Sequence, residues 1–194
     1  MPNSAQYPTE VVETLAVFVD LFNSLRDDVD ITWLSGELSK RGQIIEKTAV
    51  ADFSRVWWGV QKSLLAHGFR MVHAPKLNNN GDDDEGGKII DDQLLIREVH
   101  SCLRKFPQVT TYVLATGDGD FTPLVATLHD HGKKVILITG ERSLSGWLLE
   151  SLIGEDELIL ADQRDSANMD VPPFLNGRSE ADTGGQKDRV TASS

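Results

Sequence analysis

Apolar and polar positions alternate in blocks along most of this chain, and the blocks predict strands separated by helices. Short, nearly continuous apolar runs are typical of strands buried on both faces of a sheet. Runs with apolar residues three and four positions apart are typical of helices that cover such a sheet. The predicted strands cover residues 14–22, 43–53, 69–75, 110–116, 133–139 and 157–162, and the predicted helices cover 31–42, 54–68, 89–106, 121–132 and 143–153.

This alternation predicts an α/β fold of three layers, an α/β/α sandwich in which a mainly parallel sheet lies between two layers of helices. Right-handed connections between parallel strands place those helices on both faces of the sheet. We expect the domain to cover residues 13–163. An N-terminal extension over 1–12 precedes it, and the loss of periodicity after it predicts a flexible tail over 164–194.

Two of the predicted helices show which side chains face the sheet. In the helix over 89–106, one stripe is apolar and predicts a buried face: Leu95, Val99, Cys102 and Phe106. In the helix over 54–68, the predicted inward stripe consists of Phe53, Trp57, Val60 and Leu64. Trp58 and Leu65 then point away from the sheet, which indicates a surface for a protein partner or a second copy of the chain.

Composition agrees with a globular domain in a reducing compartment. Of the 194 residues, 40% are hydrophobic and 25% are charged, and no apolar stretch approaches the roughly 20 residues of a membrane span. The N-terminal residues lack the pattern of a secretory signal. The one cysteine, Cys102, is interpreted as a small buried apolar side chain. We therefore expect a cytoplasmic protein that does not associate with a membrane.

The formal net charge of −11 argues against broad, nonspecific adhesion to nucleic acid, which needs an excess of Lys and Arg. It does not exclude a nuclease. A cluster of carboxylates that binds divalent cations contributes negative charge itself, and the bound ions offset that charge locally.

Acidic residues from three distant parts of the chain fall at the same predicted edge of the sheet. Asp20 ends the first strand, Asp118 and Asp120 follow the fourth strand, and Asp91 with Asp92 beside it opens the helix that leads into the fourth strand. In sheets of this class, ligands bind beyond the carboxyl ends of the strands. The positions therefore predict that the acids converge.

Carboxylate oxygens are the ligands that Mg²⁺ prefers, so the converging acids predict a site for one cation, or for two about 4 Å apart. Asn23 could add an amide, and the hydroxyl of Thr116 could hold a ligand or a water. Each acid also has a structural interpretation, because Asp120 could cap the helix over 121–132 and Asp91 or Asp92 could favour the positive end of theirs. Spacing alone leaves both interpretations open.

Five segments, in order, resemble one known family. They are "VFVDLFN", "AVADF", "HGFRMVHAPK", "KIIDDQL" and "ATGDGDFTPLVATLHDHGKKV". Over residues 14 to 162 the chain is similar to the NYN domain family, specifically its LabA-like branch, a relative of the PIN-domain nucleases. The resemblance implies a PIN-like fold and a metal-dependent endoribonuclease that uses Mg²⁺ or Mn²⁺ on an RNA substrate.

Transferred position by position, the resemblance implies that Asp20, Asp91 and Asp118 are the principal catalytic metal ligands. Asp120 holds the ion or orients the water, with support from Asn23, Thr116 and Asp92. The sequence departs from the family pattern at three positions. Thr116 replaces a usual Ser, Leu21 replaces a frequent Gly, and Arg97 stands where a further acid is common, for which Asp92 or Glu98 could substitute.

Three cations lie near the acidic edge and are predicted to contact RNA phosphates: Lys76, Lys88 and Arg142. The alternative is that each is ordinary solvated surface. Two other functions compete with a ribonuclease. One is a non-catalytic RNA-binding or regulatory adaptor with the same fold. The other is a phosphatase of the haloacid-dehalogenase type, since "DGDFT" fits that motif although it follows the fourth strand instead of the first.

Overall fold

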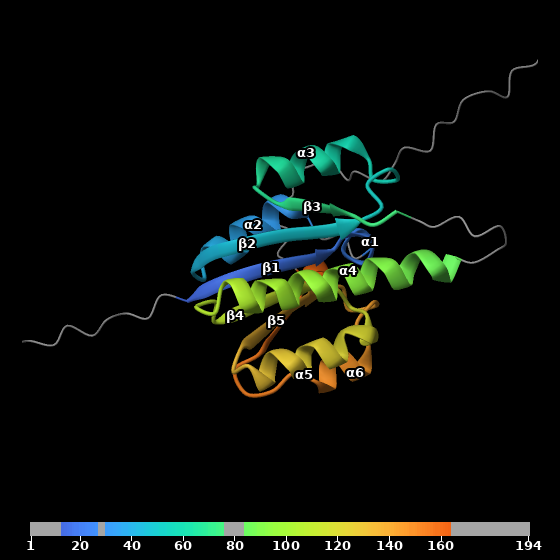
Figure 1. Ribbon diagram of the computed structural model, residues 1–194. Helices are drawn as coiled ribbons and strands as arrows, with labels where there is room; N and C mark the ends of the chain where they lie inside the picture. The colour runs from blue at the N-terminus through green and yellow to red at the C-terminus, as the bar shows by residue number, and fades with distance from the viewer. Residues whose placement is uncertain (1–12, 27–29, 76–83, 164–194) are drawn as a thin grey trace, which may run out of the picture. The chain divides into compact units, whose positions relative to one another are not determined.

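The computed structural model describes residues 13–26, 30–75 and 84–163 of the chain. Six strands form one sheet in which every neighbouring pair is parallel, in the order β3-β2-β1-β4-β5-β6 (Figure 1). The strands are β1 Thr14–Asp20, β2 Gln43–Ala51, β3 Arg70–His73, β4 Thr111–Ala115, β5 Lys134–Thr139 and β6 Glu157–Leu160. The predicted parallel α/β fold is confirmed.

Helices follow the strands almost throughout. They are α1 Leu21–Arg26, α2 Ile31–Ser39, α3 Trp58–Ala66, α4 Asp84–Lys105, α5 Thr122–Asp130 and α6 Gly146–Glu150, with short 3-10 turns η1 Gly119–Phe121 and η2 Ala161–Gln163. None of the helices within the described ranges is both long enough and apolar enough to cross a membrane.

The strand order creates a crevice between β1 and β4. From β1 the chain builds outward to β2 and β3, and then α4 carries it back so that β4 pairs with the other side of β1. Connections leave the carboxyl ends of β1 and β4 in opposite directions, which opens a space at this edge of the sheet. Asp20 ends β1 here, and Asp118 follows β4.

Each face of the sheet has its own buried core, because successive side chains of a strand point to opposite faces. On β1, Leu15, Val17 and Val19 pack with α1, α2 and α3, whereas Ala16 and Phe18 pack with α4, α5 and α6. Asp20 continues the second series by two residues. Its side chain therefore belongs to the face that α4 covers.

Several predicted boundaries shift. The first strand ends at Asp20 instead of continuing to residue 22, since α1 begins directly at Leu21, whose side chain is fully buried. The helix predicted over 89–106 begins at Asp84, so Asp91 and Asp92 do not open it as predicted. They lie two turns inside the helix, where the favourable end of its dipole no longer explains them.

The predicted inward stripe around α3 is wrong at one position. Residues before Trp58 form a turn, so the helical phase does not extend back to Trp57, and 59% of the Trp57 side chain is exposed. Leu64 is buried as predicted, and Trp58 and Leu65 point outward as predicted. Whether a partner or second copy covers them stays a prediction.

Other expectations have mixed outcomes. Cys102 is buried in the core between α4 and the sheet, as predicted, and accepts a contact from the Tyr112 hydroxyl at 3.7 Å. The predicted N-terminal extension, the tail and Lys76 lie outside the described residues, and the Lys88 side chain is likewise not described.

Candidate metal centre

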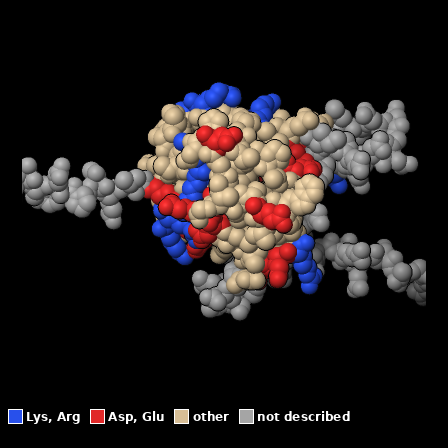
Figure 2. Space-filling view, turned by 90° about the horizontal axis from the view of Figure 1, so that it is seen from below, with Lys and Arg blue, Asp and Glu red and all other residues tan. Residues whose placement is uncertain are grey.

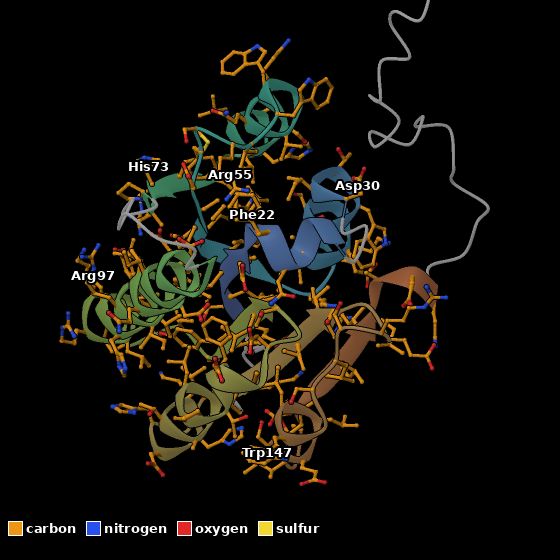
Figure 3. All side chains as sticks on the ribbon, turned by 90° about the vertical axis from the view of Figure 1, so that its right-hand side faces the viewer. Phe22, Asp30, Arg55, His73, Arg97 and Trp147 are labelled. Atoms are coloured by element: carbon orange, nitrogen blue, oxygen red, sulfur yellow. The ribbon has the colours of Figure 1, made fainter. Side chains whose placement is uncertain are left out.

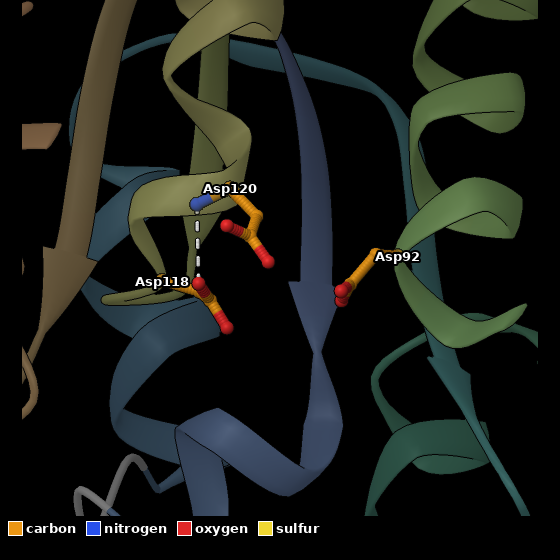
Figure 4. Close-up of side chains that lie close together, drawn as sticks. All are labelled: Asp92, Asp118 and Asp120. Atoms are coloured by element: carbon orange, nitrogen blue, oxygen red, sulfur yellow. Dashed lines mark hydrogen bonds between the residues drawn. The ribbon is translucent and has the colours of Figure 1, made fainter. Parts of the chain in front are cut away.

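Three carboxylates meet at the edge of the sheet where β1 and β4 end. Asp92 from α4 and Asp118 and Asp120 from the turn after β4 each offer one oxygen, and these three oxygens lie within 4.8 Å of one another. Figure 4 shows the three side chains directed into one space from two sides. Within the described ranges, no other group of acids, His or Cys gathers in this way.

The cluster contains Asp92 and not its neighbour Asp91. Both precede buried Leu95 by about one turn, at three and four residues, so both border the buried stripe of α4, and the oxygen that meets Asp118 and Asp120 comes from Asp92. Asp91 is turned by about 100° around the helix axis. It lies seven residues before Glu98, on the side of α4 that faces Arg70, and it is not part of the group.

Glu98 is likewise directed away from the centre. Its carboxylate accepts hydrogen bonds from Arg70 at 2.8 Å and from Arg97 at 3.1 Å. Although burial raises the pKa of Glu98, these two guanidinium groups outweigh it, and the net pKa is lowered. Of the two acids that could replace the family acid at Arg97, the structure brings only Asp92 to the cluster.

The turn after β4 is built by Asp118. Its backbone is extended, and its Oδ1 accepts a hydrogen bond from the Asp120 backbone N–H at 3.1 Å, which starts η1. Phe121 is fully buried behind this turn and fixes it to the core. The helix α5 has no side-chain cap, so the interpretation of Asp120 as a helix cap is wrong. The Asp120 carboxylate is left to face Asp118 and Asp92.

Gly117 is required by close packing. A Cβ atom there would lie 2.3 Å from the Ser143 carbonyl oxygen and 2.5 Å from the Thr139 hydroxyl. The Ser145 backbone N–H donates to the Gly117 carbonyl at 2.9 Å, which joins this turn to the loop after β5. Its φ is not among the positive values, so the glycine permits a close approach of two loops, not a left-handed turn.

Asp20 lies beside this cluster and is held by two predicted supporting residues. Asn23 Nδ2 donates to Asp20 Oδ2 at 3.1 Å, and the Thr116 hydroxyl donates to the same oxygen at 3.3 Å. The Asp118 backbone N–H in turn donates to Thr116 Oγ1 at 3.2 Å. Thr116, which is fully buried, therefore connects Asp20 to Asp118.

The surroundings of Asp20 are unfavourable for its negative charge. Burial raises the pKa of this carboxyl, and the nearby charge of Asp118 raises it further. Hydrogen bonds from Asn23 and Thr116 act in the opposite direction but do not compensate. A carboxylate whose hydrogen bonds do not offset the cost of burying its charge is typical of a cation-binding site without its cation.

The donor set suits a hard divalent cation. All three clustered groups are carboxylates, and oxygens bound to one Mg²⁺ or Mn²⁺ lie about 3.0 to 4.2 Å apart. The 4.8 Å limit of the cluster is within a small side-chain rotation of that span. Asp92, Asp118 and Asp120 are the residues that fit such an ion, with Asp20 beside them.

An open cleft of about 1030 Å³ adjoins the carboxylates. Asp118 and Asp120 form part of its lining, and Arg142, Ser143, Ser145 and Trp147 from the segment after β5 form another part. Arg142 was predicted from sequence to approach this edge. Trp147 was missed, because an aromatic residue in a short apolar segment reads as core, whereas 77% of its side chain is exposed.

Comparison with known proteins identifies a family and relatives of known structure. The model described as the NYN domain matches residues 14–151. The crystal structure of a protein of unknown function from Vibrio parahaemolyticus has 21% sequence identity and a TM-score of 0.66, covering 81% of this chain and 98% of that one. No curated protein matches this chain. At this identity the structural likeness concerns the fold.

Proposed function

Since the chain belongs to the NYN domain family, whose members are generally nucleases with a PIN-like fold, we propose that it is a divalent-metal-dependent ribonuclease of the LabA-like branch. The observation that carries this proposal is the convergence of Asp92, Asp118 and Asp120 within 4.8 Å at the edge where β1 and β4 end. The proposed reaction is hydrolysis of a phosphodiester bond in RNA, within the chain.

The residues around the site have distinct roles in this proposal. Asp92, Asp118 and Asp120 hold Mg²⁺ or Mn²⁺, and Asp20 completes the negative environment from the β1 side. When bound, such a cation offsets phosphate charge and favours ionisation of a water. Asn23 and Thr116 orient Asp20, and Thr116 also fixes the backbone at Asp118. Arg142, on the cleft wall, binds a phosphate of the RNA.

The test of the proposed function is hydrolysis of a labelled RNA oligomer in the presence of Mn²⁺ or Mg²⁺. We expect the wild type to cleave it, and Asp118→Asn to lower the rate at least about a hundredfold while the fold is retained. Equal rates in the two proteins would refute the proposal. Retained RNA binding with no cation binding and no hydrolysis would instead indicate the adaptor.

A second pair of variants decides which acid of α4 belongs to the site. The family pattern points to Asp91, whereas the clustered oxygen comes from Asp92. We expect Asp92→Asn to lower hydrolysis far more than Asp91→Asn, because the two side chains leave the helix about 100° apart. A larger loss of hydrolysis in Asp91→Asn than in Asp92→Asn would instead identify Asp91 as the metal ligand from α4.

The phosphatase alternative has no support beyond its short motif. Membership of the NYN family covers the segments on both sides of "DGDFT". An absence of activity toward a generic aryl phosphate would remove that alternative.

A further inference from the structure

The cleft beside the carboxylates has a second wall, of which the proposed function uses only Arg142. Its components are a cation, two hydroxyl groups and an exposed indole: Arg142, Ser143, Ser145 and Trp147. Figure 3 looks at the carboxyl end of the sheet and shows Trp147 on the outside of the segment that carries it. The wall therefore combines an aromatic face with polar groups beside the acidic cluster.

Exposure of Trp147 is unusual for its residue type. With 77% of its side chain exposed, it is the most exposed of the large apolar residues within the described ranges. The neighbouring Leu148 is fully buried and anchors the same short helix. Since Leu148 fixes the backbone, Trp147 contributes little to packing, and an exposed aromatic ring at a cleft is typical of a binding surface.

The net charge of the protein indicates which kind of contact could give this surface affinity for RNA. A net charge of −11 repels RNA at long range, so affinity must come from local contacts. On the face shown in Figure 2, acidic and basic side chains are interspersed and form no continuous basic patch. Stacking of bases on aromatic rings is a contact that does not depend on net charge.

We propose that Trp147 stacks on an unpaired base of single-stranded RNA, while Arg142 binds a backbone phosphate, so that the strand lies along the cleft past Asp118 and Asp120. This inference rests on the proposed function for its ligand and names the substrate class. A base inside a duplex is already stacked on its neighbours, so Trp147 selects single-stranded over double-stranded RNA.

The chain offers a matched control for this proposal. Trp58, on α3, is 62% exposed and is not part of the cleft lining. Its helix packs against β3, at the opposite edge of the sheet from β5 and β6. Loss of either indole removes a comparable exposed surface, but only one of them borders the carboxylates.

The experiment is fluorescence anisotropy with a labelled single-stranded RNA oligomer and its duplex, in EDTA so that hydrolysis does not consume the probe. We expect Trp147→Ala to weaken binding of the single strand about tenfold and Trp147→Phe to restore most of it. Trp58→Ala and the duplex affinity of Trp147→Ala should both remain within about twofold of the wild type. Circular dichroism confirms that each variant is folded.

Four results would overturn the inference: no detectable binding by the wild type, wild-type affinity in Trp147→Ala, an equal loss for duplex, or an equal loss in Trp58→Ala. Hydrolysis measured on the same proteins separates this inference from the proposed function. Trp147-dependent binding without hydrolysis by the wild type leaves the stacking site and refutes the nuclease. Hydrolysis with an unchanged KM in Trp147→Ala leaves the nuclease and refutes the stacking site.

Discussion

Two aspartates lie at the carboxyl ends of neighbouring strands, and their surroundings shift the pKa values of their carboxyl groups in opposite directions. Asp52 follows β2 and is 5% exposed, and Asp20 ends β1 and is partly buried. The pKa of Asp52 is lowered, whereas the pKa of Asp20 is raised. Their positions along the sheet edge are similar. Burial is the largest cause of the raised pKa of Asp20, whereas the hydrogen bond from the Ser54 hydroxyl is the largest cause of the lowered pKa of Asp52.

Asp52 has the partners that its charge requires. The Ser54 hydroxyl donates to its Oδ1 at 2.5 Å and the Ser54 backbone N–H donates at 3.1 Å, and these hydrogen bonds lower its pKa despite its burial. His73 Nδ1 lies 3.9 Å away. This acid organises the loop before α3 and belongs to the structure of the fold.

Asp20 accepts three hydrogen bonds, but they are long, at 3.1 to 3.4 Å, and it has a neighbour of like charge. Burial and Asp118 together outweigh the hydrogen bonds from Asn23 and Thr116. The comparison teaches that position at a strand end does not distinguish a structural acid from a functional one. The distinction is whether the surrounding donors satisfy the negative charge or leave it for an added cation.

We expect the largest effect on stability from a substitution that disrupts the turn after β4 and leaves the end of β2 intact. Gly117→Ala places a methyl group 2.3 Å from the Ser143 carbonyl oxygen, so one of the two loops must move. We expect a loss of about 3 kcal/mol in the free energy of unfolding, measured in urea, and a loss of RNA hydrolysis. Gly36→Ala is the control, since a Cβ there meets nothing within 4 Å and should stabilise α2. Equal stability of the two variants would contradict the packing account.

We expect the next largest effect from removal of Asp52, the acid whose charge is stabilised by hydrogen bonds. Asp52→Ala leaves the Ser54 backbone N–H and hydroxyl without their acceptor, and we expect a loss of about 2 kcal/mol in the free energy of unfolding. Hydrolysis per folded molecule should remain close to that of the wild type. A large loss of activity at unchanged stability would assign Asp52 to the site instead.

Replacement of Asp20 should change the free energy of unfolding in the opposite direction. Asp20→Asn removes a charge whose pKa is raised by burial and by Asp118, so we expect the metal-free protein to gain up to about 1 kcal/mol of stability. It should also hydrolyse RNA more slowly. Chemical denaturation in EDTA measures the first effect, and destabilisation there would show that the wild-type charge is well accommodated.

The smallest effect is the pH dependence of the same two comparisons. The lowered pKa of Asp52 means that its stabilisation is present above its unfolded pKa of about 3.9 and is lost as the pH falls through its folded pKa. The raised pKa of Asp20 means that its penalty appears as the pH rises above about 3.9. From about pH 3 to pH 7, the advantage of the wild type over Asp52→Ala and that of Asp20→Asn over the wild type should both grow. If the difference in stability between the wild type and one of these variants narrows as the pH rises, the direction assigned to the pKa shift of that aspartate is wrong.

The sequence was sufficient for the fold and for part of the candidate site. Continuous apolar runs predicted the buried parallel strands, apolar residues three and four positions apart predicted the helices, and strand ends predicted where Asp20 and Asp118 lie. The choice between Asp91 and Asp92 was not predicted, because it depends on the phase of α4 against the sheet, and the start of that helix at Asp84 carries no apolar signal. Extending the stripe of Leu95 and Val99 back by one turn reaches both Asp91 and Asp92, so spacing alone does not separate them.

The cleft wall was only half predicted. Arg142 was expected at the acidic edge because it follows β5, whose carboxyl end lies there. Trp147 was not, since the exposure of one apolar residue beside buried Leu148 depends on how a short helix docks. The constraint on Gly117 was not predicted either, because it comes from the approach of Ser143, a contact between distant segments.

The central claim, that Asp92, Asp118 and Asp120 together hold a divalent cation, is tested most directly by calorimetric titration of Mn²⁺ into the protein. We predict that the wild type and Asp52→Asn bind with similar affinity, and that Asp92→Asn and Asp118→Asn bind at least about tenfold more weakly. Equal affinity in all four proteins, or no binding by the wild type, would contradict the account.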